Sequence, residues 1–155
     1  MLGALAGAIL LRPAAALAQD PDLDLVRTLL ARERAAARAY GQTGVLPHAA
    51  QLAVQDADHA RVLATSVEAF GAQAPPARHP PLDPLAARVA AAPTRHAALR
   101  AALALEADLI STYARALKML AEPNTAMTVG RLAASHAQQQ VLLRRAAGRD
   151  PLASA

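Results

Sequence analysis

The sequence contains no cysteine and no tryptophan, and only three of its 155 residues are aromatic. The absence of cysteine excludes a disulfide scaffold, a cysteine-based zinc ribbon and a cysteine nucleophile. β-branched residues are also scarce, whereas alanine and leucine dominate, and this balance favours helices over strands. The composition therefore predicts an all-α protein, and its length predicts a single domain.

The chain also lacks a cluster of basic residues. Its formal net charge is +4, but the arginines are scattered and only Arg144 and Arg145 are adjacent. Nucleic-acid-binding proteins usually gather such residues on one face or tail, so no nucleic-acid partner is expected. Neither a Gly-x-Ser-x-Gly motif nor a glycine-rich phosphate loop is present. An alternative, binding to an anionic surface, rests on the arginines of the first expected helix: Arg27, Arg32, Arg34 and Arg38.

The first 18 residues have the pattern of a secretory signal peptide. An apolar run over residues 2–11 is followed by Arg12-Pro13 and by an A-x-A site at residues 16–18. The run is too short to span a bilayer, so no transmembrane helix is expected in the mature chain. Because no Lys or Arg precedes the run, we expect a basic segment upstream of Met1. The pattern predicts export to the periplasm or cell envelope, and an ordinary N-terminal tail is the alternative.

Proline, glycine and capping residues divide residues 19–150 into four long helical segments. The first is expected from Asp20-Pro21 to Gly41 or Gly44, and the second from Pro47 to Gly71. The third is expected from Thr94 to just before Pro123, and the fourth from Asn124 to Gly148. We therefore expect an antiparallel four-helix bundle.

A proline-rich stretch separates the second and third helices. Residues 73–93 hold six of the eleven prolines, which predicts an extended crossover with one short helical piece at residues 85–91. Two short turns and one long central connection distinguish this pattern from an up-and-down bundle.

Polar residues interrupt the inward-facing stripe of each helix at its middle. A 4-3 spacing places these residues on inward positions: Glu33, Asp56, His59, Glu106 and His136. An unpaired buried carboxylate costs several kcal/mol. No lysine lies on the inward stripes to neutralise the three carboxylates of this group, Glu33, Asp56 and Glu106. A bound cation would compensate them. The alternative is a satisfied network, in which His59 bonds Glu33 and His136 pairs with Glu106 as imidazolium and carboxylate.

The two halves of the sequence repeat one pattern. Glu33 lies seven residues before Tyr40, and Glu106 lies seven residues before Tyr113. In each half the next helix carries an inward histidine. We expect the two tyrosines to be core aromatics or hydrogen-bond partners of the polar groups.

These motifs resemble the ferritin-like di-iron carboxylate superfamily, in which two helices each supply one Glu and the other two each supply Glu-x-x-His. Glu33 and Glu106 resemble the single glutamates, Asp56-x-x-His59 resembles one Glu-x-x-His motif, and Ala133-x-x-His136 resembles the other without its carboxylate. The segments LLARERAAARAYG, ALALEADLISTYARAL and FGAQAPP are similar to exported bacterial ferritin-like domains. The resemblance covers residues 24–147.

The resemblance implies a metal site of incomplete composition. Glu33 and Glu106 would be terminal ligands, Asp56 a bridge, and His59 and His136 the nitrogen donors. The implied cofactor is iron or manganese, with zinc also suited to these ligands. Because Ala133 removes one bridging carboxylate, a single ion, a weakened pair and no ion all remain open.

Two functions follow from this sequence. The first is an exported ferritin-like domain that binds a metal ion inside the bundle, with redox activity left open. The alternative is a metal-free bundle that serves as a structural or interaction module in the cell envelope. A homo-oligomer is compatible with both, and the sequence does not decide whether the protein is an enzyme.

Overall fold

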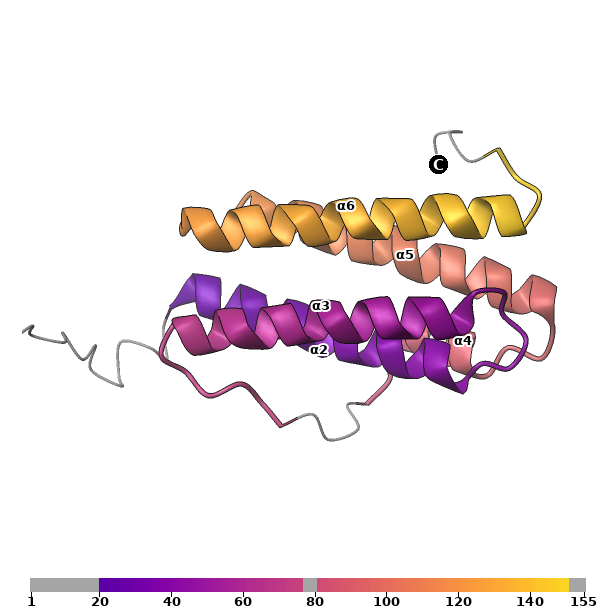
Figure 1. Cartoon of the computed structure of the whole chain (residues 1–155), viewed down its shortest axis with the longest axis horizontal. Helices are drawn as coiled ribbons and strands as arrows, with labels where there is room; N and C mark the ends of the chain where they lie inside the picture. The colour runs from indigo at the N-terminus through magenta and orange to yellow at the C-terminus, as the bar shows by residue number, and fades with distance from the viewer. Residues whose placement is uncertain (1–19, 77–80, 151–155) are drawn as a thin grey trace, which may run out of the picture.

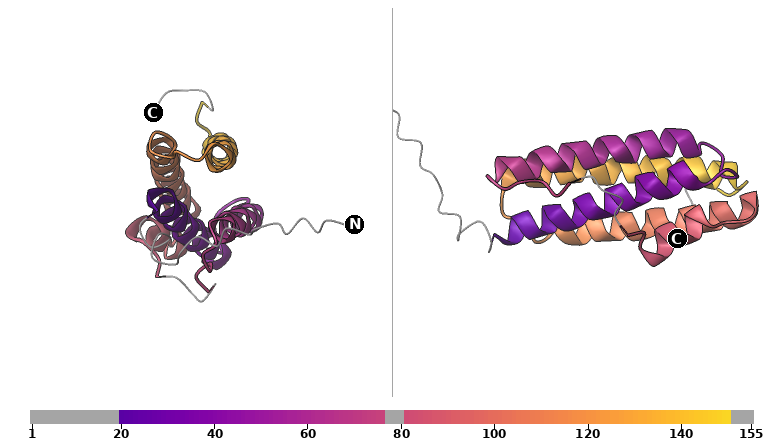
Figure 2. Two further views of the ribbon diagram at one scale, coloured as in Figure 1. Left: turned by 90° about the vertical axis from the view of Figure 1, so that its left-hand side faces the viewer. Right: turned by 90° about the horizontal axis from the view of Figure 1, so that it is seen from below.

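The computed structural model describes residues 20–76 and 81–150, and the described part of the chain is all-helical. Its five helices are α2 (Pro21–Gln42), α3 (Ala49–Ala69), α4 (Pro84–Ala90), α5 (Arg95–Leu117) and α6 (Pro123–Ala146). The four long helices lie side by side, and the short α4 packs against α2 and α5 (Figure 1, Figure 2). The expected signal segment at residues 1–18 lies outside the described residues, as do residues 77–80 of the expected crossover.

Local signals account for where the helices begin. Asp20 caps α2 by accepting a hydrogen bond from the amide of Asp22, and Thr94 caps α5 by accepting one from Ala97. Helix α3 follows His48, which has a positive φ of 62°, and the chain leaves α3 through Gly71 at a φ of 76°.

The expected start of α6 at Asn124 is wrong. The cap is Glu122, whose carboxylate accepts hydrogen bonds from the amides of Asn124 and Thr125. Pro123 fits the first helical position because its missing N–H would have no partner within the helix there. These bonds also lower the pKa of Glu122.

On α6 the 4-3 spacing through His136 also predicts Ala133 and Gln140 on the inward stripe, and the structure differs at both positions. Leu132 and Gln139 are buried, whereas Ala133 and Gln140 are only half-buried. Both choices are compatible with a 4-3 spacing, and the packing turns the larger Leu132 inward in place of Ala133. On α5, similarly, Leu105 and Leu109 are buried, whereas Leu103 and Ile110 are only half-buried.

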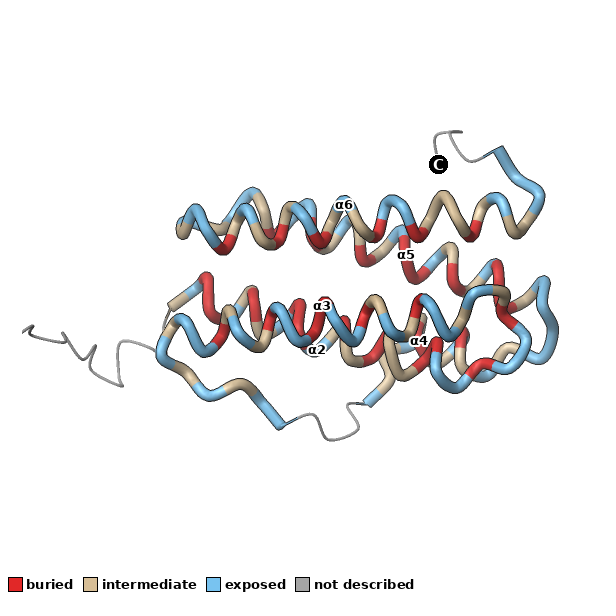
Figure 3. The backbone as a smooth tube through the Cα atoms, viewed as in Figure 1, coloured by how far each residue is buried: buried red, intermediate tan, exposed pale blue. Residues whose placement is uncertain are grey.

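Buried residues alternate with exposed ones along each long helix (Figure 3). The buried apolar residues form two clusters, and a layer of buried polar residues lies between them. One contains Leu23, Leu30, Leu63 and Val129; the other contains Leu46, Leu52, Leu99, Leu105 and Leu143. Each fully buried leucine contributes about 1.5–3 kcal/mol, so these clusters can offset the cost of a polar layer.

The arginines of α2 bind other parts of the chain. Arg32 forms ion pairs with Asp108 on α5 and with Asp83, the N-cap of α4, and the latter has an N–O distance of 3.6 Å. Arg34 donates a hydrogen bond to the carbonyl of Pro75 at 2.8 Å. These contacts engage two of the four arginines on which the anionic-surface alternative rests.

The part of the chain that the structure describes contains no helix that is both long and apolar enough to cross a membrane.

Candidate metal centre

The polar layer brings together side chains from all four long helices. Glu33 comes from α2, Asp56 and His59 from α3, Glu106 from α5 and His136 from α6. Four of the five are fully buried, and His59 retains 8% of its surface exposed. Asp56 and His59 share one face of α3 because residues three apart are neighbours on a helix.

His136 bridges the two glutamates. Its Nε2 lies 2.7 Å from Oε1 of Glu33, and its Nδ1 lies 2.9 Å from Oε2 of Glu106. Both nitrogens must donate to satisfy two carboxylates, which requires the imidazolium. Burial opposes that charge, but the hydrogen bonds and charges of Glu106 and Glu33 outweigh it and raise the pKa of His136 from 6.5 to about 11.

His59 is held on two sides as well. Its Nδ1 lies 3.2 Å from Oε2 of Glu33 and 3.7 Å from Oδ1 of Asp56. Its Nε2 lies 3.0 Å from the hydroxyl of Ser135 on α6. Each histidine therefore has one ring nitrogen close to Glu33. Its other nitrogen contacts a different residue, which is Ser135 for His59 and Glu106 for His136.

Glu33 lies at the centre of these contacts. Burial disfavours its charge, but hydrogen bonds with His136, His59 and Tyr113 lower the pKa of Glu33 from 4.5 to about 2. Glu33 is therefore a carboxylate at neutral pH, and it contacts both histidines at once.

The two tyrosines bind glutamates across the bundle. Tyr40 on α2 donates to Oε1 of Glu106 at 2.5 Å, and Tyr113 on α5 donates to Oε1 of Glu33 at 2.6 Å. Burial, together with the neighbouring carboxylates, raises the pKa of both phenols well above 10. Both therefore remain donors, which confirms the expectation that they are hydrogen-bond partners of the polar groups.

Asp56 differs from the other carboxylates because one of its oxygens is free. Its Oδ1 accepts a hydrogen bond from Nε2 of Gln139 at 2.9 Å, but no described residue binds its buried Oδ2. Burial and the charges of Glu33 and Glu106 raise the pKa of Asp56 well above 3.8. A buried polar atom without a partner is costly, so this oxygen is the clearest sign of a missing ligand.

Four of the five predicted residues converge closely enough to share an ion. One ligand atom from each of Glu33, Asp56, His59 and His136 lies within 4.8 Å of the others. Imidazole nitrogens and carboxylate oxygens are the donors that iron, manganese and zinc take in proteins. Asp56 belongs to this group and also carries the unpartnered Oδ2, so these residues fit a divalent metal ion. Glu106 lies beside this group, bound to His136 and Tyr40, and its ligand role stays a prediction.

Sequence reasoning missed two residues of the polar layer, Ser135 and Gln139. Gln140 was expected to face inward, but Gln139 is the buried residue that contacts Asp56. The size of Leu132 relative to Ala133 was the available signal, since it selects the stripe that contains residue 139. Ser135 carried no comparable signal because its partner lies on another helix.

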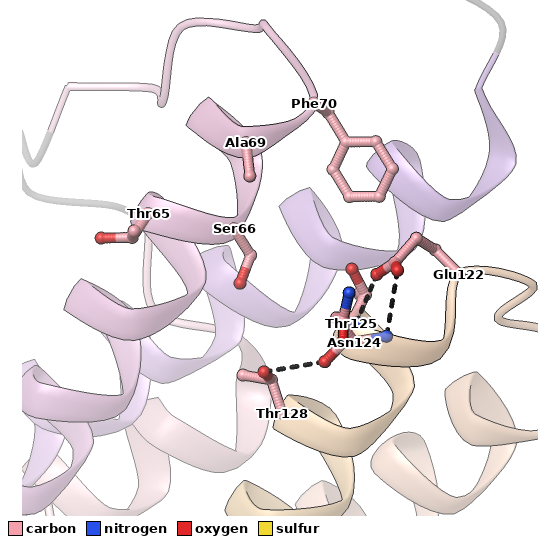
Figure 4. Close-up of a pocket in the computed structure, with 8 residues that line it drawn as sticks. All are labelled: Thr65, Ser66, Ala69, Phe70, Glu122, Asn124, Thr125 and Thr128. Carbon is pink, nitrogen blue, oxygen red and sulfur yellow. Dashed lines mark hydrogen bonds between the residues drawn. The ribbon is translucent and has the colours of Figure 1, made fainter.

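A separate pocket of about 480 Å³ opens between the end of α3 and the start of α6 (Figure 4). Three of its four hydroxyls already bond the backbone of their own helices: Thr65 to Arg61, Ser66 to Val62 and Thr128 to Asn124. Ser66 and Thr128 each lie about two turns along the helix from His59 and Ser135, respectively. The pocket is therefore distinct from the polar layer.

The sequence profile of one family, described as "Ferritin-like domain", matches residues 18–149. Comparisons with curated proteins and with solved structures give no significant match.

Proposed function

The chain belongs to the ferritin-like domain family, and on this premise we propose that it binds a metal ion in its polar layer. The four long helices then form an antiparallel bundle with one crossover, residues 73–93, between α3 and α5. The ligands come from α2, α3 and α6, so the site depends on the assembled bundle.

One observation carries this proposal: the buried Oδ2 of Asp56 has no partner in the described chain, although Asp56 belongs to a group of four residues whose ligand atoms converge. A structural network would be expected to satisfy each of its members, since an unpartnered buried oxygen costs about 1–3 kcal/mol. A cation at this position would supply the missing partner and neutralise the carboxylates.

The ligand set favours iron or manganese. Two imidazoles and two carboxylates suit these ions and also suit zinc. A bound iron or manganese ion would supply redox chemistry with oxygen or peroxide. The chain's own contribution is to hold the ligands: Tyr113 fixes Glu33, Gln139 fixes Asp56 and Ser135 fixes His59.

Export is a further part of the proposal. The apolar run and A-x-A site of residues 1–18 support secretion across the cytoplasmic membrane. Fractionation of cells that express the chain together with the basic segment expected upstream of Met1 tests this, with the chain that begins at Gln19 as the matched control. Recovery of both forms from the cytoplasm would contradict export.

The alternative function is a metal-free structural or interaction module. It is supported by His136, which as an imidazolium neutralises Glu33 and Glu106 without a metal. Under this alternative the polar layer would specify how the helices pair, and Asp56 would remain protonated.

Elemental analysis of the full chain purified without chelators tests the proposal. We expect bound metal in the wild type and in the control His96→Ala, which removes an exposed histidine of α5. His59→Ala should lose the metal. A wild type that is metal-free and takes up neither Fe(II), Mn(II) nor Zn(II) would contradict metal binding and favour the structural module.

A further inference from the structure

We propose that the centre holds a single metal ion, with Glu106 and Gln139 as residues that position ligands. The ligands are Glu33, Asp56, His59 and His136. This inference rests on the proposed metal binding and specifies its stoichiometry. It also gives Glu106 a different role from the terminal ligand expected from the family pattern.

Glu106 is hydrogen-bonded on both oxygens outside the converging group of ligand atoms. Its Oε1 accepts the hydrogen bond of Tyr40, and its Oε2 faces Nδ1 of His136 at 2.9 Å. Glu33 also accepts hydrogen bonds, but it contacts both histidines and belongs to the group whose ligand atoms converge, whereas Glu106 does not.

The contact between Glu106 and His136 is the arrangement expected for a supported histidine ligand. A metal-binding histidine usually donates its other ring N–H to a carboxylate, which fixes the ring orientation and raises the basicity of the ligating nitrogen. Here Nδ1 faces Glu106 and Nε2 faces Glu33, within the group of four ligands. When the imidazolium releases its Nε2 proton to solvent, Nδ1–H stays bound to Glu106, which directs the free Nε2 towards the ion position.

Gln139 has the equivalent role for Asp56. Its amide donates to Oδ1 of Asp56 at 2.9 Å and leaves Oδ2 as the carboxylate atom without a partner in the described chain. Gln139 comes from α6, the helix in which Ala133 replaces the second carboxylate of the family pattern. Helix α6 thus lacks the bridging carboxylate but supplies an amide that orients a ligand on α3.

The number of donors limits the site to one ion. Two imidazoles and two carboxylates complete a four-coordinate set, with bond lengths of about 2.0–2.2 Å for zinc-like ions. The four ligand atoms lie within 4.8 Å of one another, so small side-chain shifts would bring them to one centre. With Ala133 in place of a carboxylate and Glu106 engaged elsewhere, a second ion has no bridging pair.

Titration of the metal-free full chain with Co(II) tests this inference, followed by the visible absorption of the bound ion and by its stoichiometry. We expect one ion per chain in the wild type. Glu106→Gln should also bind one ion, with an affinity lower by about 10–100-fold and a similar spectrum, because its amide oxygen can still accept the N–H of His136. Glu106→Leu should bind more weakly than Glu106→Gln, and Asp56→Ala should not bind.

Gln139→Leu gives a second comparison that does not depend on the folding of the Glu106 variants. It should retain one ion per chain with an affinity lower by about 10–100-fold. Circular dichroism of each metal-free variant verifies the helical fold. Two ions in the wild type, or loss of binding in Glu106→Gln equal to that in Asp56→Ala, would overturn the single-ion inference and leave metal binding intact. A wild type that binds no ion would overturn metal binding itself.

Discussion

The two halves of the bundle carry the same motif but use it differently. In the first half, α2 and α3 supply Glu33, Asp56 and His59, all of which belong to the group that could share an ion. In the second half, α5 and α6 supply only His136 to that group, while Glu106 is engaged with His136 and Tyr40. The first half thus provides ligands, and the second half mainly orients and neutralises them.

One position of the repeat accounts for most of this difference. Ala133 removes the carboxylate that would match Asp56, and Gln139 on the same helix supplies a donor to Asp56 instead. The reciprocal bonds of Tyr40 with Glu106 and of Tyr113 with Glu33 still preserve the twofold pattern. The repeat therefore remains in the framework of hydrogen bonds after the ligand set has become unequal.

The largest effect is expected from Glu33, which connects the two halves. In the metal-free protein, Glu33→Gln should lower the free energy of unfolding by about 3–5 kcal/mol, because His136 loses one of its two carboxylates in a buried site. Urea denaturation measures this. The control is Asp58→Asn, which breaks an exposed ion pair with Arg61 and should cost less than about 1 kcal/mol. Equal losses in both variants would contradict the central place of Glu33.

The alkaline stability of the metal-free protein should depend on the second half. His136 has a pKa of about 11 in the folded state against 6.5 for a free histidine, so its stabilisation is present below pH 6.5 and declines as the pH rises towards 11. The free energy of unfolding should fall by about 2–3 kcal/mol between pH 7 and pH 9, because unfolding releases one proton from His136 in this range. His136→Gln should abolish this slope, and a bound metal should reduce it. A flat profile in the wild type would contradict a charged His136.

In the first half, the pKa of Glu33 is lowered, so its contribution to stability has the opposite pH dependence. Glu33 has a pKa of about 2 against 4.5, so its stabilisation is present above pH 4.5 and declines as the pH falls towards 2. Asp56 partly offsets this loss, because its raised pKa favours the folded state when it is protonated. The decline in stability at alkaline pH is therefore easier to assign to one group than the decline at acidic pH.

Substitution of the two tyrosines should have similar effects on stability but different effects on metal affinity. Tyr40→Phe and Tyr113→Phe each remove a hydrogen bond to a buried carboxylate and should cost about 1.5–3 kcal/mol in thermal or urea unfolding. Tyr113→Phe should also weaken metal binding by about 10–100-fold because Glu33 is a ligand. Tyr40→Phe should weaken it less, since Tyr40 reaches the site only through Glu106. Equal losses of affinity would argue that Glu106 is a ligand too.

The smallest effect is expected at Ser135, the outer partner of the partly exposed His59. Ser135→Ala should lower the free energy of unfolding by about 0.5–1.5 kcal/mol. It should lower metal affinity by less than Tyr113→Phe does. Ser111→Ala on the exposed face of α5 is the matched control. A loss of affinity as large as that in His59→Ala would mean that Ser135 contacts the ion.

Local signals in the sequence predicted much of the fold. Asp20-Pro21 and Thr94 mark helix starts because capping and proline geometry act over a few residues. The five polar positions also followed from the 4-3 spacing, and the structure brings them into one layer. At Pro123 the same logic missed the start by overlooking that a glutamate can cap a helix.

The pairing between helices could not be predicted in the same way. A 4-3 spacing allowed either Gln139 or Gln140 to face inward, and the inward packing of Leu132 on the same stripe selects Gln139. Likewise, no periodicity indicates that Tyr40 contacts Glu106 in the opposite half, or that Ser135 contacts His59 on α3. Such contacts depend on the rotation of each helix, which tertiary packing determines.

Anomalous diffraction from crystals of the full chain grown with Mn(II) tests the central claim most directly. The account predicts one anomalous peak in the polar layer, bound by Glu33, Asp56, His59 and His136, with Glu106 still contacting Nδ1 of His136. A polar layer without a peak, under conditions in which Mn(II) is in excess, would contradict the proposed metal centre.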